Sequence, residues 1–207
     1  MRSGRMSRRG IGLLMFAWVG LAGLPALAQA PAASGTSAGD TSEEWIKKLA
    51  APATDPEIDL VELKKQAADR IKSKAEPIPN KRPLLAPELT KLPQFVAEIL
   101  FDDDVAVVRP DSYRTLGRIA DTITHPSMLG HKFLIVGHTA SGGRRDFNLT
   151  LSQRRADVIR DVLVNTFKVS PKRLVTLGLG EEQLLDRARP GAPANNQFHV
   201  ITIGKMI

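Results

Sequence analysis

Few residues in this 207-residue sequence are spaced as a catalytic or metal site would require. The four histidines, at positions 125, 131, 138 and 199, lack the short spacings of metal ligands, and the chain has no cysteine. Ser152 has no G-x-S-x-G motif around it, which favours a helix cap over a nucleophile. We therefore expect no bound metal, no cofactor and no enzymatic activity.

Two further stretches are better explained as turns than as ligand sites. Asp102 to Asp104 follow a predicted strand without the surrounding ligands of a calcium loop, which is typical of a solvated turn. Gly142-Gly143 is not followed by the GK[ST] of a phosphate-binding loop, so these are turn glycines. We expect His138 to orient its loop through a backbone hydrogen bond.

The stretch with the clearest binding chemistry begins where an apolar run ends, at Gly137. Its motifs are Gly137-His138-Thr139, Asn148-x-x-Leu151-Ser152-x-x-Arg155-Ala156 and Gly178-x-Gly180-Glu181. Their letters and spacing resemble the OmpA-like C-terminal domain, whose pattern is roughly GHTD, N..LS..RA, G.GE and NRRV. The resemblance covers residues 93–204. It implies non-covalent binding of peptidoglycan in the periplasm of Gram-negative bacteria.

The resemblance also implies a site for a zwitterion, the diaminopimelate end of the peptidoglycan stem peptide. In the family, the Asp of GHTD contacts the ammonium group, and the Arg of LSxxRA holds the carboxylate through two parallel hydrogen bonds. The arginine is present here as Arg155, whereas Ala140 stands at the position of the Asp. Thr139 and Asn148 are predicted to belong to the same ligand-binding site, and the Asn148 amide is also expected to hold the loop.

The sequence departs from the family pattern at both ends of this site. A bound ammonium facing Ala140 would lose a charge-assisted contact worth about 1.5–3 kcal/mol. Asn196 and Gln197 stand where the family has two arginines, while Asn195 keeps the leading Asn. Asp146 is the candidate replacement anion; alternatively, it pairs with a neighbouring arginine or with solvent.

These departures leave two functional hypotheses open. The first is a peptidoglycan-binding module, tethered by a long linker. The second is a degenerate module that has lost peptidoglycan binding and serves as a protein-interaction or structural module of the envelope. In the second hypothesis the N-terminal helices, Trp45 or the basic pair Arg144-Arg145 would engage a protein partner.

The elements that must position these residues alternate between strand and helix. The hydrophobic pattern predicts strands over 95–101, 132–136, 174–178 and 198–203, and helices starting at Pro110 and at Ser152. This β-α-β-α-β-β order predicts an α+β fold, a mixed sheet with helices packed on it. The resemblance describes the same arrangement as an OmpA-like sandwich over residues 93–204.

The preceding residues, 29–92, are predicted to be a flexible, partly helical and proline-rich linker region. Thr41 to Glu44 favours a helix start, and a helix over 56–74 is predicted to be solvated or peripheral. Five prolines between Glu76 and Pro93 predict an extended linker and a domain boundary at residue 93.

Residues 1–28 are typical of a signal peptide. Four arginines precede an apolar run from Ile11 to Leu24, and Ala26-Leu27-Ala28 fits a cleavage site that would leave Gln29 first. Cleavage would leave 25 basic and 22 acidic residues, a net charge of +3 instead of +7, which removes most support for nucleic-acid binding. We expect a periplasmic protein without a transmembrane segment after cleavage, peripheral to the outer membrane or cell wall.

Overall fold

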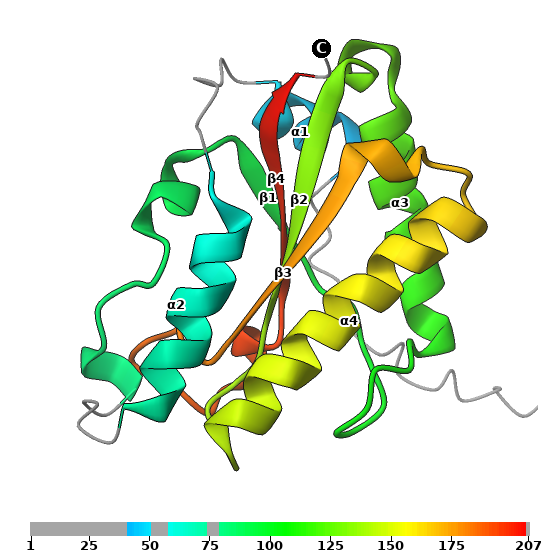
Figure 1. Cartoon of the computed structure of the whole chain (residues 1–207). Helices are drawn as coiled ribbons and strands as arrows, with labels where there is room; N and C mark the ends of the chain where they lie inside the picture. Colours follow the sequence, from blue (N-terminus) through cyan, green and yellow to red (C-terminus); the bar gives the residue numbers. More distant parts are fainter. Residues whose placement is uncertain (1–40, 51–57, 74–78, 206–207) are drawn as a thin grey trace, which may run out of the picture. The chain divides into compact units, whose positions relative to one another are not determined.

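A four-stranded mixed sheet forms the centre of the fold (Figure 1). The structure is a computed structural model that describes residues 41–50, 58–73 and 79–205; the predicted signal peptide and its cleavage site lie outside these ranges. The strand order is β1-β4-β2-β3, with β2 and β3 parallel and the other pairs antiparallel. The strands are β1 (Gln94–Ala97), β2 (His131–His138), β3 (Leu174–Gly180) and β4 (Phe198–Lys205). The chain order β1-α3-β2-α4-β3-β4 confirms the predicted fold class.

The central strand β2 is buried on both faces, which explains its unbroken apolar run. Phe133 and Ile135 point into one hydrophobic cluster, whereas Leu134 and Val136 point into a second cluster on the opposite face. Both faces of the sheet are therefore apolar, and each must be packed against other elements.

Three helices cover the first face: α1 (Ser42–Leu49), α3 (Tyr113–Thr124) and α4 (Arg145–Asn165). The predicted start of α1 is confirmed, because Thr41 and Glu44 form a reciprocal capping box. Behind it, the Trp45 ring stacks on Phe95 with a centroid distance of 4.2 Å. Thr202 Oγ1 of β4 donates to the Leu49 carbonyl, which ties α1 to the sheet.

The second face is covered by α2 (Leu60–Lys72) and by the proline-rich segment, defined as residues 79–92. The prediction of a peripheral helix is wrong, because Leu63 and Ala67 of α2 are buried against the sheet. The prediction of an extended linker is also wrong. The proline-rich segment folds into two 3-10 helices (Pro79–Lys81 and Pro87–Lys91) and buries Leu85, Ala86, Leu89 and Leu92.

The boundary predicted at residue 93 therefore does not coincide with a boundary in the packing. The prolines do break regular helix, but the apolar residues between them complete a hydrophobic cluster with Leu177, Leu179 and Ile201 of the sheet. The described residues all belong to one compact unit.

Two element boundaries also differ from the sequence pattern. Strand β1 ends at Ala97, and the following residues form a narrow hairpin in which Phe101 bridges to Val108. Helix α4 begins at Arg145, so Ser152 lies inside it and does not cap it. The Ser152 hydroxyl instead donates to the Leu149 carbonyl and accepts from the Gly180 N–H of β3.

The contact between α4 and β3 is close enough to require glycine. A Cβ atom on Gly178 would lie 2.3 Å from the Gln153 backbone nitrogen, and one on Gly180 would lie 2.9 Å from the Leu149 nitrogen. Gly180 also has a φ of +52°. These two glycines of the G-x-G-E motif let the first turns of α4 rest on β3, which places the α4 side chains beside the turn that follows β2.

Candidate functional site

The turn after β2 is held by the loop that joins β3 to β4. The Thr139 N–H donates to the Gly180 carbonyl at 3.0 Å, and the Ser141 N–H donates to the Pro190 carbonyl at 2.8 Å. Thr139 is buried, and its hydroxyl has no hydrogen-bond partner among the described residues. The predicted ligand residue Thr139 is thus part of a fixed backbone rather than of an exposed surface.

Ala140 and Asn196, both singled out by the sequence motifs, contact each other. The Ala140 N–H donates to Asn196 Oδ1 at 2.9 Å, and Ala140 is half-buried. Asn195, which precedes Asn196, is fully buried. Its amide donates to the carbonyls of Asp186, Arg189 and Pro190 and so holds the preceding loop in place. Positions 140 and 196 are therefore joined by a hydrogen bond, and neither side chain carries a charge.

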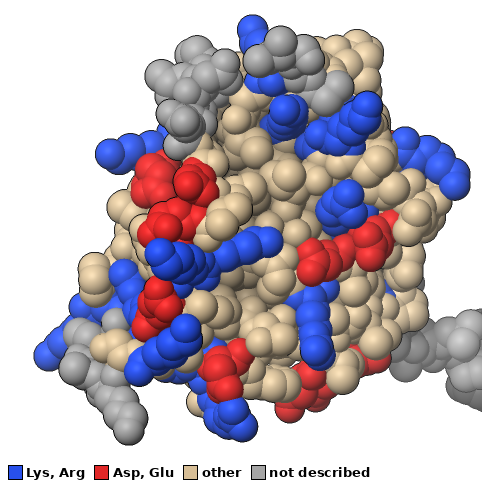
Figure 2. Space-filling model, viewed as in Figure 1, with Lys and Arg blue, Asp and Glu red and all other residues tan. Residues whose placement is uncertain are grey.

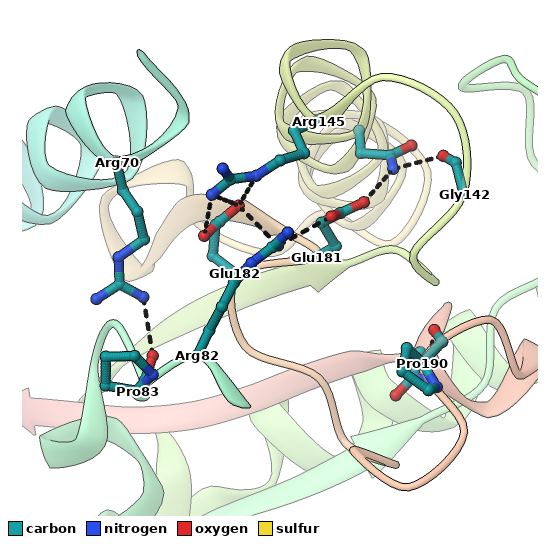
Figure 3. A network of polar contacts seen from close by, with 10 residues as sticks. Arg70, Arg82, Pro83, Gly142, Arg145, Glu181, Glu182 and Pro190 are labelled. Carbon is teal, nitrogen blue, oxygen red and sulfur yellow. Dashed lines mark hydrogen bonds and ion pairs between the residues drawn. The ribbon is translucent and has the colours of Figure 1, made fainter. Parts of the chain in front are cut away.

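Asn148 holds the turn from the other side, as the sequence predicted. It lies in the first turns of α4, and its Nδ2 donates to the Gly142 carbonyl at 2.8 Å and to Glu181 Oε2 at 2.9 Å (Figure 3). Both side chains are 5% exposed. Asn148 therefore connects the turn to the carboxylate of the G-x-G-E motif.

A buried network of charged side chains extends from Glu181 (Figure 3). Arg82 of the proline-rich segment donates to Glu181 Oε1 at 2.9 Å and lies 3.6 Å from Glu182 Oε1. Arg145 of α4 donates to both Glu182 oxygens, at distances of 2.8 and 2.9 Å. Both glutamates are buried, and each is paired with an arginine from a different element.

Arg155, the predicted carboxylate ligand, is 8% exposed beneath the hairpin of residues 101–108. Its Nε donates to the Val105 carbonyl and its Nη2 to the Asp102 carbonyl, each at 3.1 Å. Its guanidinium lies 5.0 Å from the centre of the Phe101 ring. Burial lowers the pKa of Arg155, and the nearby carboxylates of Asp104 and Asp103 oppose that shift. Arg155 therefore holds the hairpin in place through these two hydrogen bonds.

Asp146 pairs with its neighbour Arg144 at the surface. Arg144 Nε donates to Asp146 Oδ1 at 3.0 Å, and a second bond joins the guanidinium to Oδ2. The hydrogen bond from Arg144 lowers the pKa of the Asp146 carboxyl. This is the alternative that the sequence left open, and it leaves Asp146 engaged rather than free to replace a carboxylate at position 140.

An open pocket of about 650 Å³ lies between the hairpin tip and the first turns of α4. Apolar and polar side chains both line it: Asp104, Val105, Ala106, Arg144, Asp146, Phe147, Thr150, Leu151 and Arg154. Two carboxylates and two guanidinium groups give it a formal charge of zero. The pocket is suited to a ligand that carries both charges next to an apolar portion.

His138 behaves as a buried structural residue beside His199. The two rings are 4.9 Å apart, and neither His138 Nδ1 nor His199 Nε2 has a hydrogen-bond partner among the described residues. Burial lowers the pKa of His138 to about 3, with a further lowering from His199 and an opposing contribution from a hydrogen bond with the Gln183 backbone. Burial lowers the pKa of His199 to about 4. Both imidazoles are neutral at pH 7.

Sequence reasoning missed most of the charged network. The sequence places Glu181 in a motif but assigns no role to Glu182. It predicts Arg145 only as part of a basic pair for a protein partner, and Arg82 falls in the predicted linker. Arg82 follows Lys81 and precedes Pro83, a setting that resembles any solvated basic stretch. Only the fold brings its side chain next to two glutamates about a hundred residues later in the chain.

Within the described ranges, no group of three or more His, Cys, Asp or Glu side chains is arranged to hold a metal ion. In that same part of the chain, no helix combines the length and apolarity that crossing a bilayer requires.

Comparison with known proteins identifies relatives of the segment that contains this site. Outer membrane porin F of Pseudomonas fluorescens is 36% identical over 101 residues, which are 48% of this chain and 30% of that protein. The peptidoglycan-associated lipoprotein of Mesorhizobium japonicum is 35% identical over 85 residues, which are 41% of this chain and 49% of that protein. The match thus spans less than half the length of either relative.

Among solved structures, the peptidoglycan-associated lipoprotein of Burkholderia pseudomallei aligns with 55% of this chain and 92% of its own, at 24% identity and a TM-score of 0.40. The cell wall anchor of the type VI secretion system of Pseudomonas aeruginosa aligns with 51% of this chain and 76% of its own, at 23% identity and a TM-score of 0.40.

The family model described as OmpA family matches residues 100–197, a range that contains the hairpin, the turn after β2, the first turns of α4 and the G-x-G-E motif. Residues 100–197 of this chain are therefore similar to the OmpA family, in agreement with the resemblance carried by the sequence motifs.

Proposed function

We propose that this protein associates non-covalently with peptidoglycan in the periplasm and catalyses no reaction. The observation that carries the proposal is the OmpA-family match over residues 100–197, together with relatives named peptidoglycan-associated lipoproteins that are 34–36% identical to it. The predicted signal peptide supports delivery to the periplasm.

The geometry of the candidate site is compatible with this ligand. The free end of diaminopimelate carries an ammonium and a carboxylate on an alkyl chain. The open pocket offers both charges beside the apolar side chains of Val105, Phe147 and Leu151. The face shown in Figure 2 carries intermixed Lys, Arg, Asp and Glu side chains. A single-sign electrostatic attraction through this face is therefore a poorer explanation for wall association than a specific site.

A second candidate function is favoured by one observation, the uncharged contact between Ala140 and Asn196. A domain that has replaced the family's charges at both positions would have lost the ligand and kept the fold. It would then act as a protein-interaction or structural module of the envelope.

Co-sedimentation with purified Gram-negative sacculi tests both candidates. The mature chain starting at Gln29 is compared with Ala140→Asp, and Arg114→Ala on the exposed side of α3 serves as the control. Because the Ala140 backbone N–H already bonds to Asn196, the substitution adds a carboxylate without requiring a new backbone contact. We expect the wild type to sediment at physiological salt and Ala140→Asp to bind about tenfold more tightly.

The two alternatives predict different patterns. If only Ala140→Asp sediments, peptidoglycan binding has been lost in this chain and the second function stands. If neither protein sediments while both remain folded by circular dichroism, the proposed peptidoglycan association is wrong.

A further inference from the structure

We propose that Arg82 of the proline-rich segment is a positioning residue for the peptidoglycan site. Through two buried glutamates it fixes both the turn after β2 and the first turn of α4. This inference rests on the proposed function and deepens it, because Arg82 lies outside the matched residues 100–197 and adds the preceding part of the chain to the binding unit. Arg82 is 7% exposed, so it acts through Glu181 and Glu182.

The first connection leads from Arg82 to the turn after β2. Arg82 Nη1 donates to Glu181 Oε1 at 2.9 Å, and the other oxygen of the same carboxylate accepts from Asn148 Nδ2, also at 2.9 Å. Asn148 Nδ2 donates in addition to the Gly142 carbonyl at 2.8 Å (Figure 3). Because one carboxylate divides its oxygens between Arg82 and Asn148, the position of the Arg82 guanidinium determines where the side chain that holds the turn finds its acceptor.

The second connection leads from Arg82 to the first turn of α4. Arg82 Nη1 lies 3.6 Å from Glu182 Oε1, and Arg145 donates to both oxygens of Glu182. Arg144 and Asp146, the residues on either side of Arg145, line the open pocket. The buried pairing of Arg145 therefore determines how the first turn of α4 presents its two neighbours to the pocket.

The segment that carries Arg82 is also fixed to the loop that carries the glutamates. Arg187 donates to the Arg82 carbonyl, and the Ala86 N–H donates to Gln183 Oε1 at 3.0 Å. In this buried network two carboxylates lie between two guanidinium groups. Removal of the Arg82 charge leaves one buried carboxylate unbalanced, so the remaining hydrogen bonds must rearrange.

The experiment separates a displaced turn from a loss of stability. Arg82→Gln removes the cation, and Arg82→Lys keeps the charge without the planar guanidinium. Leu89→Ala in the same proline-rich segment is the matched control, because it removes buried apolar contacts on the second face and leaves the charged network intact. All proteins are the chain starting at Gln29, compared at a temperature at which circular dichroism shows each of them to be folded.

Two readouts are expected to change together. Backbone amide chemical shifts of residues 140–147, recorded without ligand, report the position of the turn and of the first turn of α4. Co-sedimentation with sacculi reports the affinity. Arg82→Gln should shift these amides and weaken sacculus binding by about tenfold. Arg82→Lys should fall between Arg82→Gln and the wild type, and Leu89→Ala should match the wild type in both readouts.

Failure of this inference is distinguishable from failure of the proposed function. If the wild type sediments and Arg82→Gln binds sacculi as tightly as Leu89→Ala, Arg82 only stabilises the fold and the inference is overturned, while peptidoglycan association stands. Unchanged amide shifts in Arg82→Gln lead to the same conclusion. If Arg82→Gln does not fold, the comparison of Arg82→Lys with Leu89→Ala decides in the same way. If the wild type does not sediment, the proposed function fails and this inference falls with it.

Discussion

At the scale of single residues, the polar side chains of the candidate site are engaged with other parts of the chain. Arg155 and Asn148 donate to backbone carbonyls, and Glu181 accepts from the side chains of Asn148 and Arg82. The Ala140 N–H donates to the Asn196 side chain. The local geometry thus depends on hydrogen bonds to backbone atoms.

The buried histidines make the stability of this region sensitive to acid. The pKa values of His138 and His199 are lowered to about 3 and about 4, below the ordinary 6.5. Their neutral forms therefore stabilise the fold above pH 6.5, and this contribution decreases as the pH falls below 6.5 towards the folded-state pKa values. Each imidazole contributes about 1.4 kcal/mol per pH unit within that window.

Urea unfolding at pH 7.5 and pH 5.0 measures this effect. We expect the wild type to lose about 2 kcal/mol more on acidification than His138→Gln. His125→Gln, at an exposed position, should follow the wild type. Equal acid sensitivity of the wild type and His138→Gln would show that His138 is not buried in its neutral form.

At the scale of elements, the proline-rich segment and helix α4 meet at the charged network. Arg82 reaches Glu181 from the segment, and Arg145 reaches Glu182 from the first turn of α4. Glu181 in turn accepts from Asn148, which binds the turn after β2. The proline-rich segment, which covers the second face of the sheet, is therefore connected to the candidate site through buried polar contacts as well as apolar packing.

Removing Arg82 should destabilise the whole described unit. Arg82→Ala leaves the buried Glu181 without its cation, which costs about 3–5 kcal/mol for pairs of this kind. Lys81→Ala, at the adjacent exposed position, should change the unfolding free energy by less than about 0.5 kcal/mol. Both values are measured by urea denaturation. A similarly small effect of Arg82→Ala would indicate that the proline-rich segment is not part of the cooperative unit.

At the scale of the whole molecule, the positive charge is concentrated in the predicted signal peptide. The four arginines of residues 1–28 account for more than half of the net charge of +7. A chain without them has a net charge of +3 and, on the face in Figure 2, both signs intermixed. If residues 1–28 are removed as predicted, most of the basic character of the full sequence is removed with them.

Cleavage after Ala28 is the matching prediction. Intact-mass measurement of the protein from the periplasmic fraction of a Gram-negative host should give the mass of a chain starting at Gln29. Replacing Ala28 with a bulky residue should abolish or shift this cleavage, because the cleavage site requires small side chains. Recovery of a chain that still starts at Met1 from that fraction would contradict the prediction.

Much of the fold could be predicted because its signals are local. Hydrophobic periodicity identified the strand and helix order from β1 to β4, and the letters of the capping box located the start of α1. The motifs with glycine, asparagine and arginine at set spacings identified the family. These patterns depend on neighbours within a few residues, so the amino-acid sequence by itself determines them.

The contacts that only the tertiary structure decided join residues that are distant in the chain. Arg82 pairs with Glu181 across 99 positions, and the hairpin that Arg155 binds lies 50 residues before it. The apolar residues between the prolines lacked a periodic pattern, because they pack as single side chains from short turns rather than as a helical face. Which of the adjacent arginines 154 and 155 is buried depends on backbone carbonyls brought together by folding, and no local pattern encodes that.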